Sequence, residues 1–210
     1  MESCRRILET GLDTLQISWS EAQIDRLLAF LKLIEKWNKA YNLTAIRNLE
    51  DMARLHLLDS LAVLPYIKGK QVIDIGTGAG LPGIPLAIFL PETSFILLDS
   101  NAKKTRFVQQ AVLELKLGNV EVCHSRAEAF QPEQKFDTVI TRAFASLPAI
   151  LETTEHLLNE CGVLLAMKGQ NPQDELAAVK VKSSVVPLAT PGVEAERCLV
   201  IIQKEAIPVG

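Results

Sequence analysis

The sequence predicts an α/β protein in which a helical cap precedes a doubly wound, seven-stranded sheet. From Lys70 onward, short apolar runs alternate with amphipathic helical stretches, the pattern of βαβ units around a mainly parallel sheet. Before Lys70, apolar residues recur at three- and four-residue steps, which is the period of an α-helix. We therefore expect residues 1–68 to form a helical extension packed on a main domain of residues 69–210.

Two main helices are expected in the cap. The first follows a Ser-x-x-Gln capping box at residues 20–23, and its apolar face is formed by Ile24, Leu27, Leu28, Leu31, Ile34 and Trp37. The second begins near Asn48 and has two acidic residues in its first turn, where the helix dipole favours them. It continues toward Pro65.

Seven apolar runs are expected to form the strands. They occupy residues 71–75, 94–100, 119–125, 136–143, 162–169, 183–189 and 198–204. The helices between them are expected at residues 83–90, 103–117, 147–158 and 174–179. The last two strands lack a full helix between them, so we expect an antiparallel pair at one edge of the sheet.

Composition is that of an ordinary globular protein of 210 residues, 48% hydrophobic and 22% charged. No apolar stretch is long enough for a signal peptide or a membrane-spanning helix. The four cysteines form no CxxC pair, which suits a reducing compartment and offers no metal-site spacing. The net charge of −3 is not that of a protein that coats nucleic acid, although a local basic patch can still steer an RNA. We expect a cytoplasmic protein without a membrane segment.

A glycine-rich loop, VIDIGTGAGLPGIPLAI at residues 72–88, follows the first strand. Its glycines have the spacing Gly-x-Gly-x-Gly (Gly76, Gly78 and Gly80), whereas a dinucleotide fingerprint needs its third glycine where this chain has Leu81. Two prolines in the loop also remove amide donors that a phosphate would use. S-adenosylmethionine fits better, because it has no phosphate and needs a close approach of the backbone, which glycines permit.

Two carboxylates are placed to serve this loop. Asp99 ends the second strand, 23 residues after Gly76, where a carboxylate accepts hydrogen bonds from ribose hydroxyls. The alternative is that Asp99 only caps the helix that starts near Asn101. Asp74 precedes the glycines, and it is equally well interpreted as a brace for the loop or as a cofactor contact.

Further segments resemble one protein family. They are EKWNKAYNLTAIR (residues 35–47), HLLDSL (56–61), DIGTGAGLPGIPLA (74–87), LLDS, SRAE, FDTVITRAFASL and MKGQ. In this order they resemble the ribosomal RNA small subunit methyltransferase G family, also called glucose-inhibited division protein B, from about residue 20 to 202. The resemblance implies a class I S-adenosylmethionine-dependent methyltransferase fold, which is Rossmann-like. It also implies methylation of the position-seven ring nitrogen of a guanine in 16S ribosomal RNA. The expected partner is 16S ribosomal RNA or the small ribosomal subunit, and we expect a monomer.

The resemblance also implies cofactor contacts at Gly76, Leu81, Ala127, Glu128 and Arg142. Together with the glycine loop and the two carboxylates, the expected cofactor site consists of Asp74, Gly76, Gly78, Gly80, Leu81, Asp99, Ala127, Glu128 and Arg142. No metal is expected. The chain departs from many relatives at Ala79, where they carry proline, and at Cys198, where some carry histidine.

The residues after the fourth and fifth strands bear on the reaction. The fourth strand is followed by TRAF rather than by the Asn/Asp-Pro-Pro-aromatic tetrad of many exocyclic-amine methyltransferases, and no cysteine nucleophile follows either strand. What remains is cationic, and we predict Arg142, Lys168 and Arg126 as the catalytic residues. The position-seven nitrogen of guanine has a lone pair and no proton, so its methylation needs orientation rather than a general base. Two alternatives stay open: Arg142 pairs with a core carboxylate, or Lys168 is an ordinary strand-end lysine.

Other conspicuous residues are expected to be mainly structural. They are the solvated charges Lys103, Lys104 and Arg106, which are a weaker candidate for RNA contact; the packing pair Trp37 and Tyr41; and His56 and His124, which hydrogen-bond locally. Two other functions compete with the preferred one, because a fold alone does not fix a substrate. One is methylation of a small molecule, and the other is non-catalytic regulation of cell division.

Overall fold

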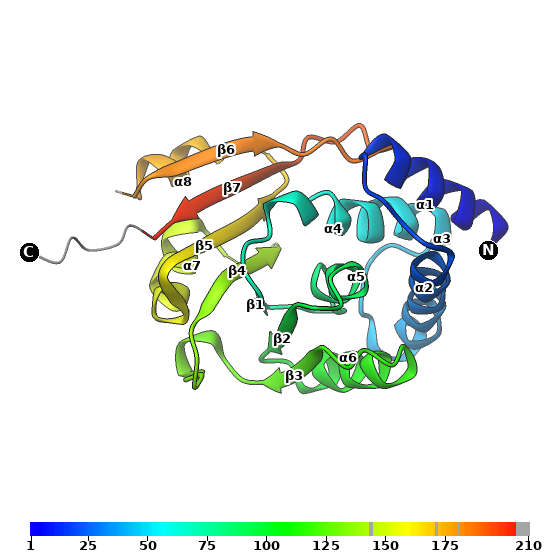
Figure 1. Ribbon diagram of the computed structural model, residues 1–210, viewed down its shortest axis with the longest axis horizontal. Helices are drawn as coiled ribbons and strands as arrows, with labels where there is room; N and C mark the ends of the chain where they lie inside the picture. Colours follow the sequence, from blue (N-terminus) through cyan, green and yellow to red (C-terminus); the bar gives the residue numbers. More distant parts are fainter. Residues whose placement is uncertain (143–144, 171, 180, 205–210) are drawn as a thin grey trace, which may run out of the picture.

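A computed structural model describes residues 1–142, 145–170, 172–179 and 181–204. Its centre is one sheet with the strand order β3-β2-β1-β4-β5-β7-β6 (Figure 1). Strands β1 to β5 pair in parallel, and β7 lies antiparallel between β5 and β6. The predicted doubly wound sheet with an antiparallel edge is confirmed. The strands are β1 Gln71–Ile75, β2 Ser94–Asp99, β3 Val120–His124, β4 Phe136–Arg142, β5 Leu158–Lys168, β6 Ser183–Pro187 and β7 Cys198–Gln203.

The cap begins with α1 (Glu2–Thr14) and α2 (Glu21–Tyr41). The capping box is confirmed, because the Ser20 side chain accepts from the Gln23 amide while the Gln23 side chain accepts from the Ser20 amide. The second predicted helix also begins as expected, with Asn48 as its N-cap. Its interior differs from the prediction, since it passes from α3 (Leu49–Met52) into a π-helix, η1 (Ala53–Leu58), then α4 (Asp59–Leu61) and the 3₁₀ turn η2 (Leu64–Tyr66).

The helices between the strands lie close to their expected positions. They are α5 (Gly83–Phe89), α6 (Ala102–Glu114), α7 (Leu147–Thr154) and α8 (Gln173–Ala177), with 3₁₀ turns η3 (Ala127–Ala129) and η4 (Glu155–Leu157). Strand β5 begins at Leu158 rather than at Gly162, because its first residue pairs with Phe136 before a shift of register. The extra residues, 159–161, are Asn, Glu and Cys and interrupt the apolar pattern, so no strand was predicted there.

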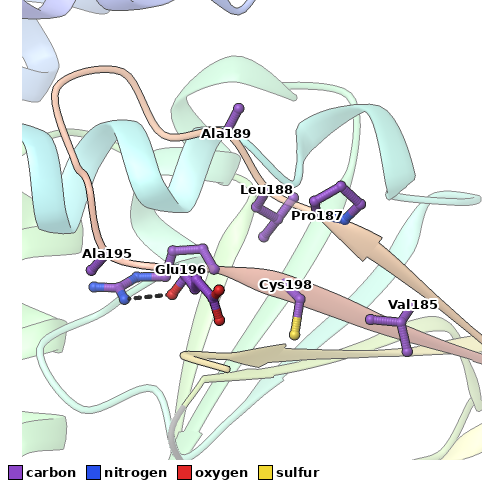
Figure 2. A pocket seen from close by; sticks show the side chains of 8 residues that line it. Val185, Pro187, Leu188, Ala189, Ala195, Glu196 and Cys198 are labelled. Carbon is purple, nitrogen blue, oxygen red and sulfur yellow. Dashed lines mark hydrogen bonds between the residues drawn. The ribbon is translucent and has the colours of Figure 1, made fainter. Parts of the chain in front are cut away.

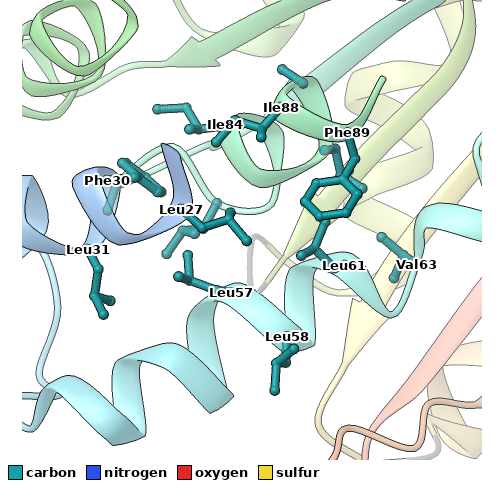
Figure 3. Packing of buried hydrophobic residues seen from close by; sticks show 14 of the residues in the cluster. Leu27, Phe30, Leu31, Leu57, Leu58, Leu61, Val63, Ile84, Ile88 and Phe89 are labelled. Carbon is teal, nitrogen blue, oxygen red and sulfur yellow. The ribbon is translucent and has the colours of Figure 1, made fainter. Parts of the chain in front are cut away.

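One face of the sheet is covered by α5, α6 and the cap. Side chains from α2, the π-helix and α5 meet over this face, as Figure 3 shows for Leu27, Phe30, Leu57, Ile84 and Ile88. All five are almost completely buried. The cap and the sheet thus share one hydrophobic core, although the boundary between residues 68 and 69 stays a prediction.

The other face is covered by α7 and α8. Alternate strand residues supply its core: Ile73, Leu98 and Val139 face α7, whereas their chain neighbours face the cap. Burial on both faces explains why the strands are continuous apolar runs in the sequence.

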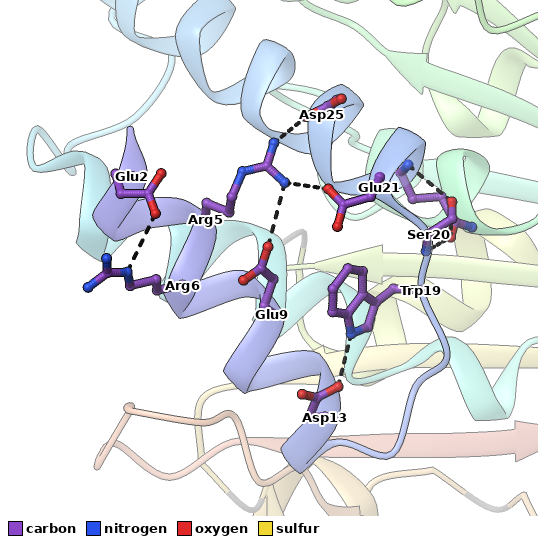
Figure 4. A network of polar contacts seen from close by, with 10 residues as sticks. Glu2, Arg5, Arg6, Glu9, Asp13, Trp19, Ser20, Glu21 and Asp25 are labelled. Carbon is purple, nitrogen blue, oxygen red and sulfur yellow. Dashed lines mark hydrogen bonds and ion pairs between the residues drawn. The ribbon is translucent and has the colours of Figure 1, made fainter.

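A polar network fastens α1 to α2 at the surface (Figure 4). Arg5 pairs with Glu9 at 3.5 Å, with Glu21 at 2.9 Å and with Asp25. Exposed pairs of this kind contribute only about 0.2 to 1 kcal/mol each, so the buried face of α1 carries most of its attachment. Among the described residues, no helix has the length and apolar character needed to cross a membrane.

Candidate functional site

Two cavities lie at the carboxyl ends of the parallel strands, on either side of the point where strand order reverses between β1 and β4. This is where ligands bind in open α/β sheets. The first cavity, of about 330 Å³, is lined by Gly76, Leu98, Asp99, Ser100, Lys104, Ser125, Arg126, Ala127 and Glu128. The second, of about 410 Å³, is lined by Ile46, Leu55, His56, Asp59, Arg142, Met167, Lys168, Gly169, Leu188 and Arg197.

The glycine loop borders the first cavity. The amide of Gly76 donates to the Leu98 carbonyl at 2.8 Å, which ties the loop to β2. Gly78 has φ +60°, and a Cβ there would meet no atom closer than the Gly76 carbonyl oxygen at 3.9 Å. The loop is therefore open on the side that Gly78 faces, and a side chain at this position would project into that space.

Gly80 and Leu81 have different surroundings from Gly78. A Cβ on Gly80 would approach the Ile84 side chain to 2.6 Å, so packing inside the protein explains this glycine. The Leu81 side chain is buried in the core, and its amide donates to the Thr77 carbonyl. Neither residue lines either cavity, and their cofactor contacts stay predictions.

Asp74 braces the loop. One of its oxygens accepts from the Thr77 hydroxyl at 2.7 Å and from the Gly83 amide at 2.9 Å. The other oxygen, Oδ1, is buried without a partner among the described residues. Burial raises the pKa of Asp74 to about 6, against the effect of these two hydrogen bonds. The interpretation as a brace is confirmed, while the unpartnered oxygen leaves a cofactor contact open.

Asp99 lies at the end of β2 and lines the first cavity. Its carboxylate accepts from the Gly78 amide at 2.9 Å and from the Asn101 amide at 2.8 Å. The side-chain N-cap of α6 is Asn101 itself, which accepts from the amides of Lys103 and Lys104. The alternative that Asp99 only caps this helix is therefore wrong, because another residue does so.

The turn after β3 completes the first cavity with Arg126, Ala127 and Glu128. The Ala127 side chain packs into the core, which fixes the turn against the sheet. The Arg126 side chain is 77% exposed and lies 3.8 Å from the Glu128 carboxylate. Two residues implied by the family resemblance thus join Gly76 and Asp99 in one cavity.

Arg142 lies in the second cavity rather than the first. Its Nη1 donates to the Leu55 carbonyl at 3.2 Å and lies 3.6 Å from the Asp59 carboxylate. Burial lowers the pKa of Arg142, and the attraction of Asp59 opposes that effect. The pairing with a core carboxylate, one of the open alternatives, is therefore present in the structure. It does not exclude contact with a ligand, since Arg142 also lines the cavity.

Lys168 shares the second cavity with Arg142. Its Nζ donates to the Ala145 carbonyl at 2.7 Å and pairs with Glu175 at 3.0 Å. These contacts hold the segment after β4 and the start of α8 against β5. The three predicted catalytic cations are thus divided, with Arg126 at the first cavity and Arg142 and Lys168 at the second.

His56 also lines the second cavity, and like Asp59 it is almost completely buried. Its Nε2 lies 2.8 Å from the Thr44 hydroxyl, and its Nδ1 has no partner among the described residues. Burial and the neighbouring Arg142 charge lower the pKa of His56 to about 4, so the ring is neutral at pH 7.

The remaining structural expectations are met except at Lys104. Trp37 packs against Tyr41 and against Phe107 of α6 in tilted arrangements, with ring centroids 5.1 Å and 5.8 Å apart. His124 lies 3.0 Å from the Ser100 carbonyl, so local hydrogen bonding by both histidines is confirmed. Lys103 and Arg106 are exposed, whereas Lys104 lines the first cavity.

Sequence reasoning missed Asp59 and Arg197. Asp59 is only 3% exposed and lies in the second cavity with Arg197, whose Nε is 3.5 Å from it. A signal was present in HLLDSL, because His56 and Asp59 are ionisable residues three positions apart in a segment that is half leucine. Such a spacing places both on one helix face. No comparable signal marks Arg197.

A third cavity, of about 420 Å³, adjoins the second one through Leu188 and Arg197. Figure 2 shows its lining side chains at the end of the β6–β7 pair where residues 188–197 connect the two strands, including Val185, Pro187 and Cys198. None of the predicted site residues lines it.

Comparisons with known proteins identify the family. A family model described as rRNA small subunit methyltransferase G matches residues 23–200. The Ribosomal RNA small subunit methyltransferase G of Legionella pneumophila (strain Corby) is 50% identical over 198 residues, which cover 94% of each chain. The protein of the same name from Pseudomonas syringae pv. syringae (strain B728a) is 52% identical over 202 residues, covering 95% of this chain and 94% of the other.

Solved structures share the fold at low sequence identity. A SAM dependent methyltransferase from Aquifex aeolicus has a TM-score of 0.57 and 19% identity, and the match covers 72% of this chain and 93% of that one. A methyltransferase from Geobacter sulfurreducens has a TM-score of 0.59 and 12% identity, with 83% and 90% covered. The predicted class I S-adenosylmethionine-dependent methyltransferase fold is confirmed. On the family model and the curated relatives, the chain belongs to the rRNA small subunit methyltransferase G family.

Proposed function

We propose that this protein transfers the methyl group of S-adenosylmethionine to the position-seven ring nitrogen of a guanine in 16S ribosomal RNA. The observation that carries the proposal is the first cavity. In a chain of this family it combines the glycine loop, a strand-end carboxylate and the turn after β3. The substrate is 16S ribosomal RNA or the small ribosomal subunit, and the protein acts as a monomer in the cytoplasm.

The residues that line the first cavity and those of the adjoining glycine loop fit the cofactor. Asp99 accepts two amides, and a carboxylate has about four lone-pair sites, so it can also accept the ribose hydroxyls. The open side of Gly78 leaves room for a ligand against the loop. The Oδ1 atom of Asp74, which has no partner among the described residues, is an acceptor behind that loop.

We assign cofactor binding to this group, with backbone contacts from Gly76, Ala127 and Glu128. Gly80 and Leu81 contribute to cofactor binding mainly by shaping the loop. Arg142 would reach the bound cofactor from the second cavity, which it lines. When bound, S-adenosylmethionine supplies an electrophilic methyl group on a sulfonium sulfur.

The protein's part in the reaction is orientation and exclusion of water. The accepting nitrogen of guanine carries no proton, so no general base is needed, and His56 with its low pKa adds no charge beside the base. Arg142 supplies donors for the guanine carbonyl or a flanking phosphate, both of which guanidinium groups bind well. We assign Arg126 to the RNA backbone at the mouth of the first cavity, and Lys168 to holding the segment that follows β4.

The test is methyl transfer to 16S ribosomal RNA taken from cells that lack this protein. Labelled S-adenosylmethionine and mass spectrometry of nuclease fragments should give one 7-methylguanosine that is absent without the protein. Transfer to a metabolite extract but not to RNA would favour the small-molecule alternative. Failure to bind S-adenosylmethionine in calorimetry would favour the non-catalytic alternative.

A further inference from the structure

The second cavity is built by three segments that lie far apart in the chain. The cap contributes His56 and Asp59, the ends of β4 and β5 contribute Arg142 and Lys168, and the end of the β6–β7 loop contributes Arg197. Its volume of about 410 Å³ lies within the range of small-molecule sites, roughly 300 to 1,000 Å³. It is therefore large enough for one nucleobase.

Asp59 joins these segments. Its Oδ2 lies 3.6 Å from Arg142 Nη1, and its Oδ1 lies 3.5 Å from Arg197 Nε and accepts from the Thr190 hydroxyl at 3.0 Å. Two guanidinium groups thus share one buried carboxylate, which leaves one positive charge in excess. The other lining cation, Lys168, is neutralised by Glu175.

Both arginines keep donors for a ligand. A guanidinium has five N–H donors. Arg142 uses Nη1 for the Leu55 carbonyl and Asp59, while Arg197 uses Nε for Asp59 and Nη1 for the Glu196 carbonyl. The remaining nitrogens have no other protein partner among the described residues, so each arginine is fixed at one side and available at the other.

The π-helix of the cap makes this arrangement possible. In η1 the hydrogen-bond ladder is wider than in an α-helix, and such turns occur frequently at functional sites. Here the Leu55 carbonyl accepts from Arg142, and His56 and Asp59 on the same helical segment both line the cavity. The His56 ring adds a buried Nδ1 without a protein partner among the described residues.

We propose that the second cavity receives the target guanine, to which Arg142 and Arg197 donate hydrogen bonds. Asp59 is the positioning residue that holds both arginines in place for this contact. This inference rests on the proposed function. The ligand chemistry follows from the donor set, because guanidinium groups match the carbonyl oxygen of guanine and the phosphate beside it. A purine without that carbonyl, such as adenine, would leave the donors of Arg142 and Arg197 without an acceptor on the base.

The test compares Asp59→Asn with Asp137→Asn as a matched control. Asp137 lies near the amino end of β4, and its carboxylate accepts from the Lys70 and Gln71 amides and from Asn159, so its loss affects the fold but not the cavity. Rates are measured on unmethylated 16S ribosomal RNA and divided by the fraction of protein that binds S-adenosylmethionine in calorimetry. We expect Asp59→Asn to lower kcat roughly 10²-fold, the size expected for misplaced positioning groups, with cofactor affinity unchanged. The control should keep its normalised kcat.

A double variant distinguishes positioning from a general loss of structure. If Asp59 acts through Arg197, then Asp59→Asn combined with Arg197→Gln is no slower than the slower single variant, because residues that act as a unit are not additive. Multiplied effects, or an Asp59→Asn rate equal to wild type, would overturn the inference while leaving the proposed function intact. A wild-type protein that binds the cofactor but does not methylate RNA would overturn the proposed function and, with it, this inference.

Discussion

The two cavities are neighbours at the same edge of the sheet, yet they are built in different ways. The first uses segments that follow β1, β2 and β3 in chain order, and most of its polar groups are backbone or solvent-facing. The second uses charged side chains from the cap, from β4 and β5, and from the β6–β7 loop, which meet at a buried carboxylate.

Because of this difference, side chains at the first cavity affect ligand affinity mainly, whereas side chains at the second affect both ligand affinity and the stability of the fold. Arg126 at the first cavity is 77% exposed and has one weak partner, whereas the Arg142 side chain is 23% exposed and ties β4 to the cap. Variants of exposed residues at the first cavity should therefore lose ligand affinity without losing stability, whereas the buried Asp99 also supports the loop. Variants at the second should change activity and stability together.

The strongest test of the first cavity is Gly78→Val. Its φ of +60° is strained for a β-branched residue, and the side chain would occupy the open side of the loop. We expect no measurable S-adenosylmethionine binding by calorimetry in a folded protein. Gly118→Val is the matched control, because nothing lies within 4 Å of a Cβ there, and it should bind normally. Normal binding by the Gly78 variant would show that the loop does not hold the cofactor.

Asp99→Ala should have the next largest effect, on the same cavity. Two hydrogen bonds from ribose hydroxyls to a charged acceptor, at about 1.5 to 3 kcal/mol each, correspond to a loss of cofactor affinity of roughly 10²-fold or more. From the sequence alone, the Asp99→Ala variant would be expected to lose little of its folding stability. Because Asp99 also accepts the amides of Gly78 and Asn101, we expect a measurable drop in melting temperature as well. Unchanged affinity in calorimetry would remove Asp99 from the cofactor site.

The contrast between the cavities also explains what the sequence could predict. Strand ends of a parallel sheet meet at one edge, so Gly76, Asp99 and the turn at Ala127 could be assigned to one crevice from their order alone. The fold could also be predicted, because the hydrophobic period and the burial pattern of each helix and strand are visible in its own segment of the sequence. The glycine spacing even distinguished the cofactor class.

The second cavity could not be predicted in this way. Arg197 and Asp59 are 138 positions apart in the chain, and nothing local to either specifies their contact. The π-helix was also missed, because its apolar residues follow a pattern that fits an ordinary helix equally well. Arg142 could be placed at a strand end, but its neighbours depend on how the cap and the β6–β7 loop pack.

Comparing the stability of Arg142→Ala with that of Arg126→Ala tests the difference between the two cavities directly. Removing Arg142 breaks a hydrogen bond to the Leu55 carbonyl and an ion pair with Asp59, and we expect a loss of about 2 kcal/mol in the free energy of unfolding. Asp59 keeps Arg197 as a partner, which limits the loss. Arg126→Ala should leave chemical denaturation unchanged. Equal stability of the two variants would contradict the coupling of binding and stability in the second cavity.

The smallest expected effect concerns the charge of His56. Its pKa is about 4 in the folded protein, against an ordinary value of 6.5. Between these values the unfolded chain binds more protons than the folded one, so stability is lost as pH falls from 6.5 toward 4. Asp74 acts in the opposite direction, because its pKa is raised to about 6, and the folded protein takes up that proton first.

Comparing wild type with His56→Gln isolates the histidine, since Asp74 is present in both proteins. Lowering the pH from about 7.5 to about 5.5 should cost the wild type about 1 kcal/mol relative to the variant. The measurement is chemical denaturation of both proteins at the two pH values. A difference in the free energy of unfolding that stays constant with pH would mean that His56 accepts a proton in the folded state as easily as in water. The second cavity would then carry a further positive charge, on His56, below pH 6.5, beside the charge that Arg142 and Arg197 already leave in excess.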